Sequence, residues 1–310
     1  MYFSKDTQDL IKHHNNHLDI SVTVDGCKEM HDSCRLFPNG NPSYDLAIAA
    51  DKDRLSINGE AGTKITIAPS NISYLYKSFI NMYTIGHRII HANCIFEEGW
   101  KLSDAIIYYK QLKQIADFLL SLEDPDDIYF ALFNESNYKP IPETDNDNWC
   151  GGTGKMLACD PDGKLYPCLR YMESSLGTSV KPLIIGDVDN GICYDEKQQT
   201  IMNSLRKITR RSQSTDECYC CPIAQGCSWC SGYNYQKFGT PNKRATFICN
   251  MHKAESLVNV YYWNSYYKKF NLSDKFPLYC DIESAIKIVG KDEYKYLLNL
   301  STSKEEIANE

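Results

Sequence analysis

Apolar residues in the first half of the chain recur at two spacings, one typical of strands and one typical of helices. The strand-like runs are rich in β-branched residues and cover 18–24, 64–68, 88–96 and 128–133. The helical stretches between them begin near Pro42-Ser43, Ser70-Asn71 and Ser103-Asp104. Such strand–helix alternation predicts an α/β fold with a parallel sheet and covering helices.

The second half of the chain has a different pattern. Lys139 to Asn148 is rich in Pro, Glu, Asp and Asn and lacks periodicity, which predicts a linker. Beyond it come a turn signal at Pro161-Asp162-Gly163, several cysteine-containing loops and a Tyr-rich helical stretch from Lys253 to Phe270. A small helical tail follows. We therefore expect three parts, at 1–140, 141–270 and 271–310.

The composition is that of a soluble globular protein, with 310 residues, 43% hydrophobic and 24% charged. A net charge of −7 disfavours a nucleic-acid partner, since phosphate binding requires a basic face. We interpret the one local basic group, Lys207, Arg210 and Arg211, as the solvated face of a helix. No apolar leader follows Met1, and no run approaches the ~20 apolar residues of a membrane span. We therefore expect a cytoplasmic protein with no membrane partner.

Fourteen cysteines are unusual in a chain expected in the reducing cytosol, where disulfides are rare. Most of them fall between Cys150 and Cys249, in two blocks. In the first block, a predicted hairpin would bring Cys168 back beside Cys150, within reach of one metal centre. The second block is Cys218-x2-Cys221-x5-Cys227-x2-Cys230, followed by Cys249.

Cys-x2-Cys spacing lets two thiolates converge on one centre, in zinc knuckles and in iron–sulfur loops alike. The five residues between Cys221 and Cys227 are few for a zinc ribbon, whose knuckles are usually about 12–20 residues apart. Short successive spacings near a proline are typical of ferredoxin loops. Iron–sulfur clusters are therefore favoured, with zinc and metal-free core cysteines as the alternatives.

This cysteine pattern resembles the SPASM domain of radical S-adenosylmethionine (AdoMet) peptide maturases. The resemblance includes Tyr166-Pro167-Cys168, Cys221-Pro222 and the ending from Cys249 to Ala254. The first half resembles the later strands of the radical barrel in those enzymes, through Ser21 to Gly26, His31-Asp32 and Arg35. Within the group, 221–230 is most similar to the branch that acts on peptides with repeated Cys-xxx units. The implied fold is a partial (β/α) barrel followed by a small cysteine-rich domain with a β-hairpin and helices.

The resemblance implies two auxiliary 4Fe–4S clusters. The implied ligands are Cys150, Cys168 and Cys230 for the first cluster, and Cys218, Cys221, Cys227 and Cys249 for the second. The spacing of Cys227 and Cys230 is one residue shorter than is usual in the family, and a further cysteine before Cys150 is absent. The first cluster therefore either keeps an open iron for a substrate thiolate or is completed by Cys159. The other role open to Cys159 is that of a core residue of the hairpin.

Radical enzymes of this family bind AdoMet at a further 4Fe–4S cluster held by Cys-x3-Cys-x2-Cys near the N-terminus. No two cysteines here are separated by three residues. We therefore expect an N-terminally truncated chain that is inactive alone and gains AdoMet and the third cluster only if an N-terminal radical SAM fragment is supplied. The residues that by resemblance face AdoMet are Thr23, Asp25, Thr66 and Asn93, and a structural role is equally open for each.

The resemblance implies the cluster-binding portion of an enzyme that modifies ribosomally made precursor peptides, with thioether formation as the reaction. One alternative is a non-catalytic electron-transfer or peptide-binding module that retains the clusters. The other is a zinc-stabilised interaction protein. The aromatic group from Tyr261 to Tyr267 is expected to pack between helices rather than to contact a peptide. No catalytic residue and no particular peptide sequence is assigned.

Overall fold

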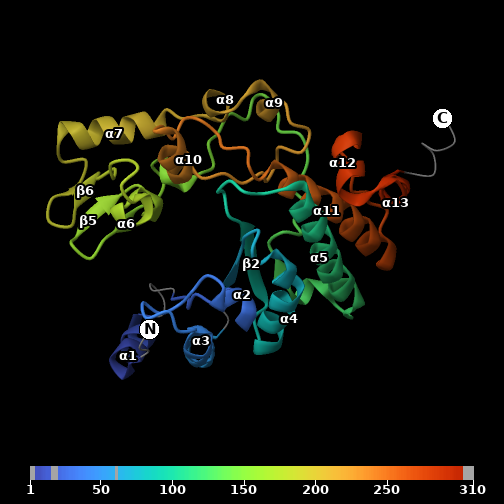
Figure 1. Ribbon diagram of the computed structural model, residues 1–310, viewed down its shortest axis with the longest axis horizontal. Helices are drawn as coiled ribbons and strands as arrows, with labels where there is room; N and C mark the ends of the chain where they lie inside the picture. Colours follow the sequence, from blue (N-terminus) through green and yellow to red (C-terminus); the bar gives the residue numbers. More distant parts are fainter. Residues whose placement is uncertain (1–3, 15–19, 60–61, 303–310) are drawn as a thin grey trace. The chain divides into compact units, whose positions relative to one another are not determined.

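The computed structural model describes residues 4–14, 20–59 and 62–302. The chain divides into two compact units, each with its own core (Figure 1). Unit 1 comprises Met1–Ile95, Gly99–Glu135 and Cys249–Glu310, and unit 2 comprises Phe96–Glu98 and Ser136–Ile248. The chain therefore leaves unit 1, forms unit 2 and returns to unit 1 for its last helices.

A three-stranded parallel sheet in the order β1-β2-β3 lies at the centre of unit 1. Its strands are β1 (Thr63–Ile67), β2 (Ile89–Cys94) and β3 (Tyr129–Phe130). Buried and more exposed residues alternate along β1 and β2, because successive side chains of a strand point to opposite faces. The strands predicted at 64–68 and 88–96 are confirmed. The one predicted at 128–133 is shortened to two residues, because the chain turns at 131–132.

The helices predicted between these strands are also present. They are α3 (Tyr44–Asn58), the short η1 (Ile72–Tyr74) leading into α4 (Leu75–Ile85), and α5 (Leu102–Ser121). The structure begins α5 just before the predicted Ser103-Asp104, with Lys101 as the N-cap residue. The Asp104 carboxylate accepts a hydrogen bond from the Lys101 amide at 2.8 Å and so caps the first turn from within the helix. Three shorter elements complete this part: α1 (Lys5–His14), α2 (Lys28–Asp32) and η2 (Pro125–Asp127).

The first predicted strand, 18–24, is wrong over its described part. Residues 18–19 lie outside the described residues, and 20–24 form no strand. Val22 and Val24 are buried while Ser21 and Thr23 are exposed, so the alternation that suggested a strand is real. In the part of the chain that the structure describes, no neighbouring strand forms backbone hydrogen bonds with this segment; instead the Asp25 side chain accepts a hydrogen bond from the Thr66 amide on β1. An alternating burial pattern does not by itself form a strand, because a strand also needs backbone hydrogen bonds to a neighbouring strand.

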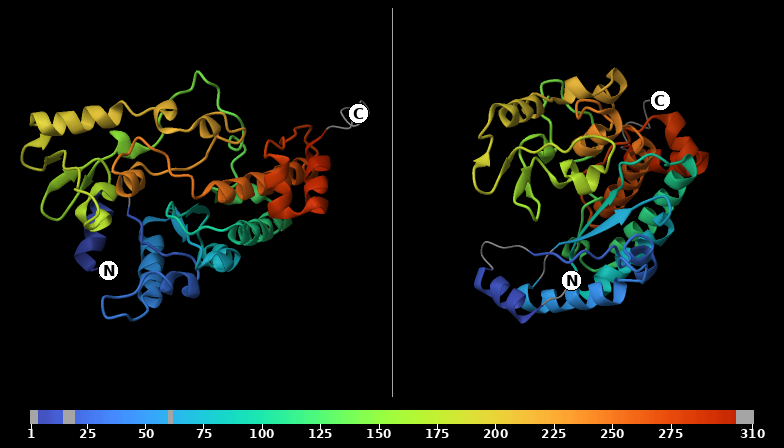
Figure 2. Two further views of the ribbon diagram at one scale, coloured as in Figure 1. Left: turned by 45° about the horizontal axis from the view of Figure 1, so that its top comes forward. Right: turned by 60° about the vertical axis from the view of Figure 1, so that its left-hand side comes forward.

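The Tyr-rich helix predicted at 253–270 is α11 (Cys249–Lys269), which lies side by side with α5 in unit 1 (Figure 2). Asn259 on α11 is fully buried, and its amide donates to the Leu132 carbonyl at 2.8 Å. Tyr262 stacks on Phe133 with ring centroids 4.6 Å apart. The prediction that the aromatic group packs between elements is confirmed for Tyr262 and Tyr267, both of which are buried.

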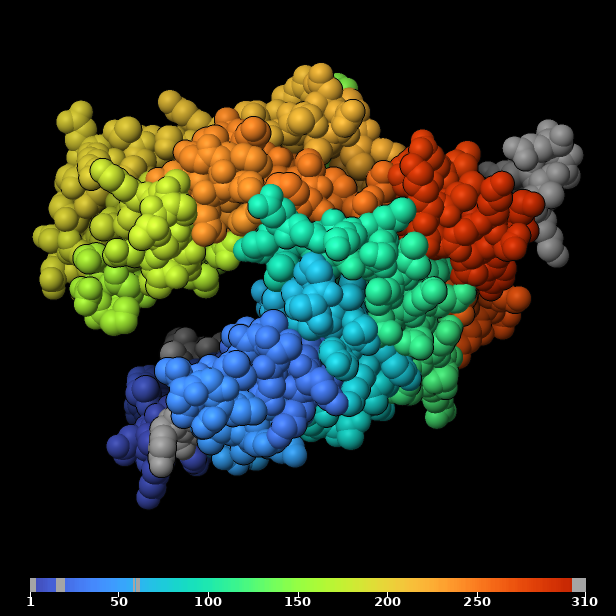
Figure 3. All heavy atoms as spheres, viewed as in Figure 1, coloured from blue at the N-terminus to red at the C-terminus, as the bar shows by residue number. Residues whose placement is uncertain are grey.

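The tail predicted to be helical forms α12 (Ile282–Val289) and α13 (Lys291–Ser301). Figure 3 shows these helices, in red, against α5, in green. Glu293 on α13 accepts a hydrogen bond from the Tyr109 hydroxyl at 2.7 Å and pairs with Lys113 at 2.5 Å, both on α5. The C-terminal helices therefore belong to the core of unit 1.

Unit 2 contains a four-stranded antiparallel sheet and several short helices. The strands, in sheet order, are β4 (Ala158–Cys159), β5 (Lys164–Tyr166), β6 (Gly186–Asp187) and β7 (Gly191–Ile192). The helices are η3 (Gly151–Thr153), η4 (Leu169–Tyr171), α6 (Glu173–Leu176), α7 (Glu196–Arg206), α8 (Arg210–Gln213), α9 (Asp216–Tyr219) and α10 (Ser231–Phe238). The predicted hairpin is confirmed, and its turn places Gly163 at a φ of 80°, a conformation that favours glycine.

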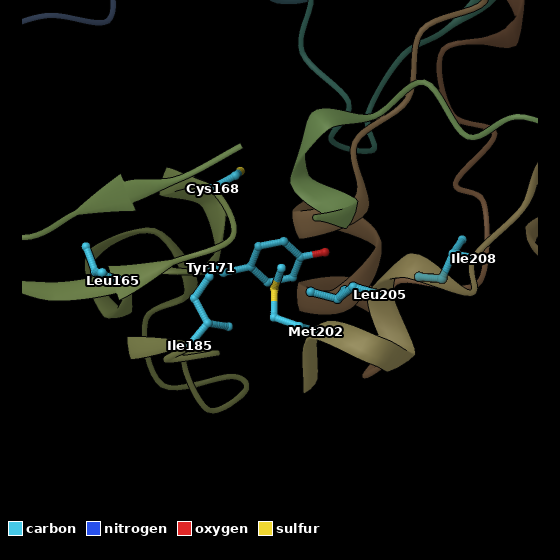
Figure 4. Packing of buried hydrophobic residues seen from close by; sticks show 7 residues of the cluster. All are labelled: Leu165, Cys168, Tyr171, Ile185, Met202, Leu205 and Ile208. Atoms are coloured by element: carbon cyan, nitrogen blue, oxygen red, sulfur yellow. The ribbon is translucent and has the colours of Figure 1, made fainter. Parts of the chain in front are cut away.

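The core of unit 2 joins this sheet to α7 (Figure 4). Its buried members are Leu165, Cys168, Tyr171, Ile185, Met202, Leu205 and Ile208. The Tyr171 ring lies near the middle of the cluster, and its hydroxyl points away from Leu165 (Figure 4). One predicted cluster ligand, Cys168, is thus anchored directly in the core.

The two units do not coincide with the predicted parts 1–140, 141–270 and 271–310. The principal difference is α11, which packs on α5 and so joins unit 1, although its sequence follows the cysteine loops directly. Within the described residues, no helix combines the length and the apolar character required to cross a bilayer.

Candidate metal centre

Cys150, Cys168 and Cys230 each stand immediately before a helical turn in unit 2. They are the N-cap residues of η3, η4 and α10, respectively. The Arg170 amide donates to the Cys168 sulfur at 3.3 Å, and the Tyr233 amide donates to the Cys230 sulfur at 3.4 Å. Amide hydrogens directed at sulfur stabilise a thiolate, the form in which cysteine binds metal.

These three residues come together around Gly152 and Ser231. The Ser231 hydroxyl lies 3.1 Å from the Cys150 sulfur. A Cβ atom placed on Gly152 would lie 2.9 Å from the Ser231 oxygen and 3.5 Å from the Cys168 sulfur, so only glycine leaves this space free. Cys230 directly precedes Ser231 in the chain. The structure therefore places Cys150 and Cys168 beside Gly152 and Ser231, with Cys230 one residue from Ser231 in the chain.

Burial and neighbouring charges act on the pKa of the Cys168 and Cys230 thiols and on that of their neighbour Arg170. Burial raises the pKa of the Cys168 and Cys230 thiols, so both hold their protons at neutral pH until a metal displaces them. Burial lowers the pKa of Arg170, but its ion pair with Glu97 at 2.6 Å outweighs that effect and raises it. The Arg170 guanidinium therefore stays charged beside the Cys230 sulfur, where it favours the thiolate.

The residues around the three thiols fit a sulfur-containing metal group. Among the described residues, no three His, Cys, Asp or Glu side chains are placed to hold a single metal ion. Within the described ranges of the chain, the fully buried Tyr171 hydroxyl makes no hydrogen bond of normal distance and angle. Burial raises the pKa of Tyr171, the neighbouring Ser231 hydroxyl opposes this effect, and the thiols of Cys150, Cys168 and Cys230 add to it. A buried donor without an acceptor is costly, and an iron–sulfur cluster between the thiols would supply sulfur acceptors.

Cys159 lies on β4, opposite Leu165 of β5. It is exposed, so it is not a core residue of the hairpin. Its thiol donates to the carbonyl of Asp160 at 3.3 Å, at the entrance to the turn. The contacts that join Cys150, Cys168 and Ser231 do not involve it.

The second group of predicted ligands lies on α9 and the loop that follows it. Cys218 is on α9, whose N-cap Thr215 accepts a hydrogen bond from the Cys218 amide at 3.3 Å. Two tight turns connect Cys221 to Cys227 through Ala224. All three cysteines are partly exposed. The fourth predicted ligand, Cys249, is the first residue of α11 and belongs to unit 1.

Arg210 bonds to the segments around this second group, a role that the sequence pattern did not predict. It is 4% exposed, so the interpretation of Lys207, Arg210 and Arg211 as one solvated face is wrong for Arg210. Its guanidinium donates to the Tyr219 carbonyl at 2.8 Å, to the Asp145 carbonyl at 3.0 Å and to the Pro142 carbonyl at 3.3 Å. It also lies 4.0 Å from the centre of the Tyr219 ring. Arg210 thus ties α9 to the linker, and no sequence signal separates it from Arg211.

The four residues predicted to face AdoMet lie in unit 1, and three of them are neighbours. Asp25 is buried and accepts from the Thr66 amide at 2.9 Å, and Thr66 pairs with Asn93 in the β1–β2 register. Arg35 forms an ion pair with the other oxygen of Asp25. Thr23 is exposed and lines a cavity of about 260 Å³ together with His31 and Arg35.

The parallel α/β unit, followed by an antiparallel hairpin unit with clustered cysteines, is the fold of radical SAM enzymes that carry a SPASM domain. No family model and no curated protein matches the chain. Among solved structures, it is similar to anSMEcpe, a radical SAM SPASM-domain maturase.

The similarity to hexahistidine-tagged anSMEcpe with bound AdoMet has a TM-score of 0.57 at 13% identity, over 94% of this chain and 72% of that one. Native anSMEcpe with AdoMet and the Kp18Cys peptide gives a TM-score of 0.53 at 14% identity, over 85% of this chain and 72% of that one. At these identities the similarity establishes the fold, which confirms the predicted fold class.

Proposed function

We propose that this chain is the iron–sulfur-cluster-binding portion of a radical SAM/SPASM peptide maturase. The observation that carries the proposal is that Cys150, Cys168 and the Cys230-Ser231 pair come from three separate segments and lie around Gly152. The fold shared with anSMEcpe, solved with AdoMet and with peptides, supports it.

In this proposal Cys150, Cys168 and Cys230 bind the first 4Fe–4S cluster, and Cys218, Cys221, Cys227 and Cys249 bind the second. When bound, such clusters accept and donate single electrons at potentials that their surroundings set. The residues of the chain prepare the first site in three ways. The amides of Arg170 and Tyr233 stabilise thiolates, the Arg170 guanidinium adds positive charge, and Gly152 leaves room beside Cys168.

With only three cysteine ligands, one iron of the first cluster would have no protein ligand. Cys159 lies exposed on the hairpin, with its thiol bonded to a backbone carbonyl. The proposal therefore leaves the fourth iron of the first cluster for a thiolate of the substrate. A ribosomal precursor peptide with Cys-xxx repeats would supply such thiolates, and the product would be a thioether-linked peptide.

On the AdoMet side, the proposal assigns Asp25, Thr66 and Asn93 to the wall that faces the cofactor, with Thr23 beside them at the cavity. Asp25 holds Arg35 and the Thr66 amide at the same time, which fixes the edge of β1. AdoMet and the third cluster require a Cys-x3-Cys-x2-Cys segment, which this sequence does not contain. An N-terminal radical SAM fragment would be the partner that supplies it, in the cytoplasm.

Anaerobic reconstitution with iron and sulfide tests the proposal. We expect iron and acid-labile sulfide in near-equal amounts and the electron paramagnetic resonance (EPR) signals of reduced 4Fe–4S clusters. A colourless protein that binds zinc in preference to iron would refute it and favour the zinc-stabilised alternative.

The missing cysteine motif favours a second candidate, an electron-transfer or peptide-binding module that keeps its clusters without radical chemistry. An AdoMet-cleavage assay separates the two candidates. The reconstituted chain is incubated with AdoMet and reductant, with and without the N-terminal fragment. Cleavage that appears only with the fragment supports the maturase, and no cleavage in either case supports the module.

A further inference from the structure

Two hydroxyl groups stand beside the three thiols, and cysteine ligation alone gives them no role. The first is that of Ser231, which is fully buried and lies 3.1 Å from the Cys150 sulfur. A metal-bound thiolate carries no proton, so in the loaded site the serine hydroxyl is the donor of this hydrogen bond. At hydrogen-bond distance from a ligand sulfur, Ser231 is placed to donate to that sulfur rather than to bind a separate iron.

The second hydroxyl is that of Tyr171, which lies in the core of unit 2 with no exposed surface. Among the described residues it makes no hydrogen bond of normal distance and angle, and its polar neighbour is the Ser231 hydroxyl. A tyrosine hydroxyl carries its proton at neutral pH, so it can donate a hydrogen bond.

A donor buried without an acceptor costs about 1–3 kcal/mol, so such groups are rare in folded proteins. In this site, an iron–sulfur cluster bound by the thiols would supply the acceptor that the hydroxyl lacks. Sulfide and thiolate sulfur both accept hydrogen bonds, and such bonds are one of the factors that set the potential of a cluster. They stabilise the more negative, reduced state and so raise the reduction potential.

We propose that the hydroxyls of Ser231 and Tyr171 donate hydrogen bonds to sulfur atoms of the cluster site formed by Cys150, Cys168 and Cys230, and thereby raise the reduction potential of that cluster. The inference rests on the proposed function, because it requires a cluster at these thiols. Both are positioning residues: neither binds iron, Ser231 acts through the Cys150 sulfur, and Tyr171 would act through a sulfur of the bound cluster.

Tyr171→Phe and Ser231→Ala each remove one hydroxyl and keep the rest of the packing. The matched control is Tyr235→Phe. Tyr235 packs against the same core and lies 5.8 Å from the Tyr171 ring, but its hydroxyl donates to the Lys181 carbonyl at 2.9 Å. The full chain and each variant are reconstituted anaerobically, assayed for iron and sulfide, and titrated with reductant while EPR spectra are recorded.

We expect Tyr171→Phe and Ser231→Ala to retain the iron of the wild type. In both, the midpoint potential of one cluster signal becomes more negative, and the signal of the second cluster stays unchanged as an internal reference. Tyr235→Phe should shift neither signal. Unchanged potentials in fully loaded variants would overturn the inference and leave the proposed function intact. Failure of either variant to assemble the cluster would also overturn it, because a tuning donor is dispensable for assembly.

A second measurement, on protein without iron, tests the unpartnered hydroxyl directly. Without a cluster, Tyr171→Phe removes a buried donor that bonds to nothing, so the variant should be as stable as the wild type or more stable towards urea. A clear loss of stability would mean that the hydroxyl already has a protein acceptor, and the assignment of Tyr171 would be wrong. If the wild type binds no iron at all, the proposed function fails and this inference fails with it.

Discussion

At the scale of single residues, Cys168 and Cys159 are cysteines of the same hairpin region with different surroundings. Cys168 lies in the core, accepts a hydrogen bond from a backbone amide and adjoins Gly152. Cys159 is exposed and bonds to a carbonyl. The arrangement favours Cys168 as a metal ligand and leaves Cys159 outside the first site.

Replacing Cys168 with serine should remove the first cluster. With two clusters in the wild type, we expect Cys168→Ser to lose roughly half of the bound iron and sulfide. Cys159→Ser is the matched control and should keep the wild-type amount. The measurement is iron and acid-labile sulfide per chain after anaerobic reconstitution. Equal losses in both variants would make Cys159 the fourth ligand and rule out an open iron.

The sequence predicted the thiols of this site but not the groups around them. Cysteine is rare enough that its spacing predicted a metal centre, and the resemblance to the SPASM domain implied Cys150, Cys168 and Cys230 as the ligands of one cluster. Ser231 and Tyr171 belong to common residue types, and their importance comes from contacts between segments far apart in the chain. The role of a buried hydroxyl depends on whether it has an acceptor, which no local pattern encodes.

Asp160 controls the turn that returns the chain towards Cys168. Its carboxylate accepts from the amides of Asp162 and Lys164 at 3.0 and 2.9 Å and from the Tyr166 hydroxyl at 2.8 Å. Burial raises the pKa of Asp160, but these hydrogen bonds lower it by a larger amount. The net effect is a lowered pKa. A lowered pKa means that the stabilisation is complete above the unfolded value of about 3.9 and disappears as the pH falls through the folded pKa.

Asp160→Ala should therefore destabilise unit 2 at pH 7, and its difference from the wild type should shrink below about pH 4. Urea unfolding between pH 7 and pH 3, on protein without iron, measures this. Asp162→Ala is the control, because its exposed carboxylate pairs only with Lys164 at 3.7 Å. If the difference in free energy of unfolding between Asp160→Ala and the wild type stays constant down to pH 3, the role assigned to the ionised carboxylate is wrong.

At the scale of elements, the helices and strands with strong periodicity were predictable, and the exceptions have physical causes. β1, β2, α4 and α5 follow apolar patterns that their caps or flanking breaks delimit. The segment 20–24 carries a strand-like pattern but lacks a strand neighbour, and β3 ends early at a turn. Strand formation depends on a partner that lies elsewhere in the sequence, whereas a helix satisfies its own backbone.

α8 and α9 are short elements, and the buried Arg210 side chain of α8 donates to the carbonyl of Tyr219 on α9 and to two carbonyls of the linker, so Arg210 should be important for their arrangement. Arg210→Met removes the donors to three carbonyls, and we expect a loss of at least about 2 kcal/mol in the free energy of unfolding of unit 2. It should also weaken iron binding by the Cys218, Cys221 and Cys227 group more than by the first site.

Arg211→Met provides the control for this prediction. Arg211 is exposed and pairs with Asp216 at 2.9 Å, so its loss should cost under about 1 kcal/mol. Urea unfolding and iron analysis of the two variants give both quantities. Equal effects at the two positions would show that burial of Arg210 does not organise the cysteine loop.

At the scale of the whole molecule, unit 1 is built from three separate segments of the chain, the last of which follows unit 2. The sequence placed 249–270 with the cysteine loops because Cys249 completes their pattern. In the structure, the same helix contributes buried contacts to unit 1: Glu255 accepts from the Tyr108 hydroxyl at 2.8 Å, and Asn259 donates to the Leu132 carbonyl. Tertiary packing decides which element covers the apolar face of a helix. The cysteine spacing therefore could not show that α11 packs on α5.

Because the two units have separate cores and the three cysteines of the first site all lie in unit 2, metal should stabilise the units unequally. A site filled at ~100 times its dissociation constant stabilises the structure that forms it by about 2.7 kcal/mol, or ~100-fold in amide exchange through unfolding. We therefore expect iron removal to accelerate hydrogen exchange in α7, α10 and β5, while α5 and α13 exchange as before. Hydrogen exchange followed by mass spectrometry on loaded and iron-free protein provides the measurement, and Cys168→Ser should reproduce the iron-free pattern around the first site. Equal acceleration in α5 and α13 would instead mean that the chain unfolds as one cooperative body, in which the metal stabilises the parallel sheet as strongly as the cysteine loops.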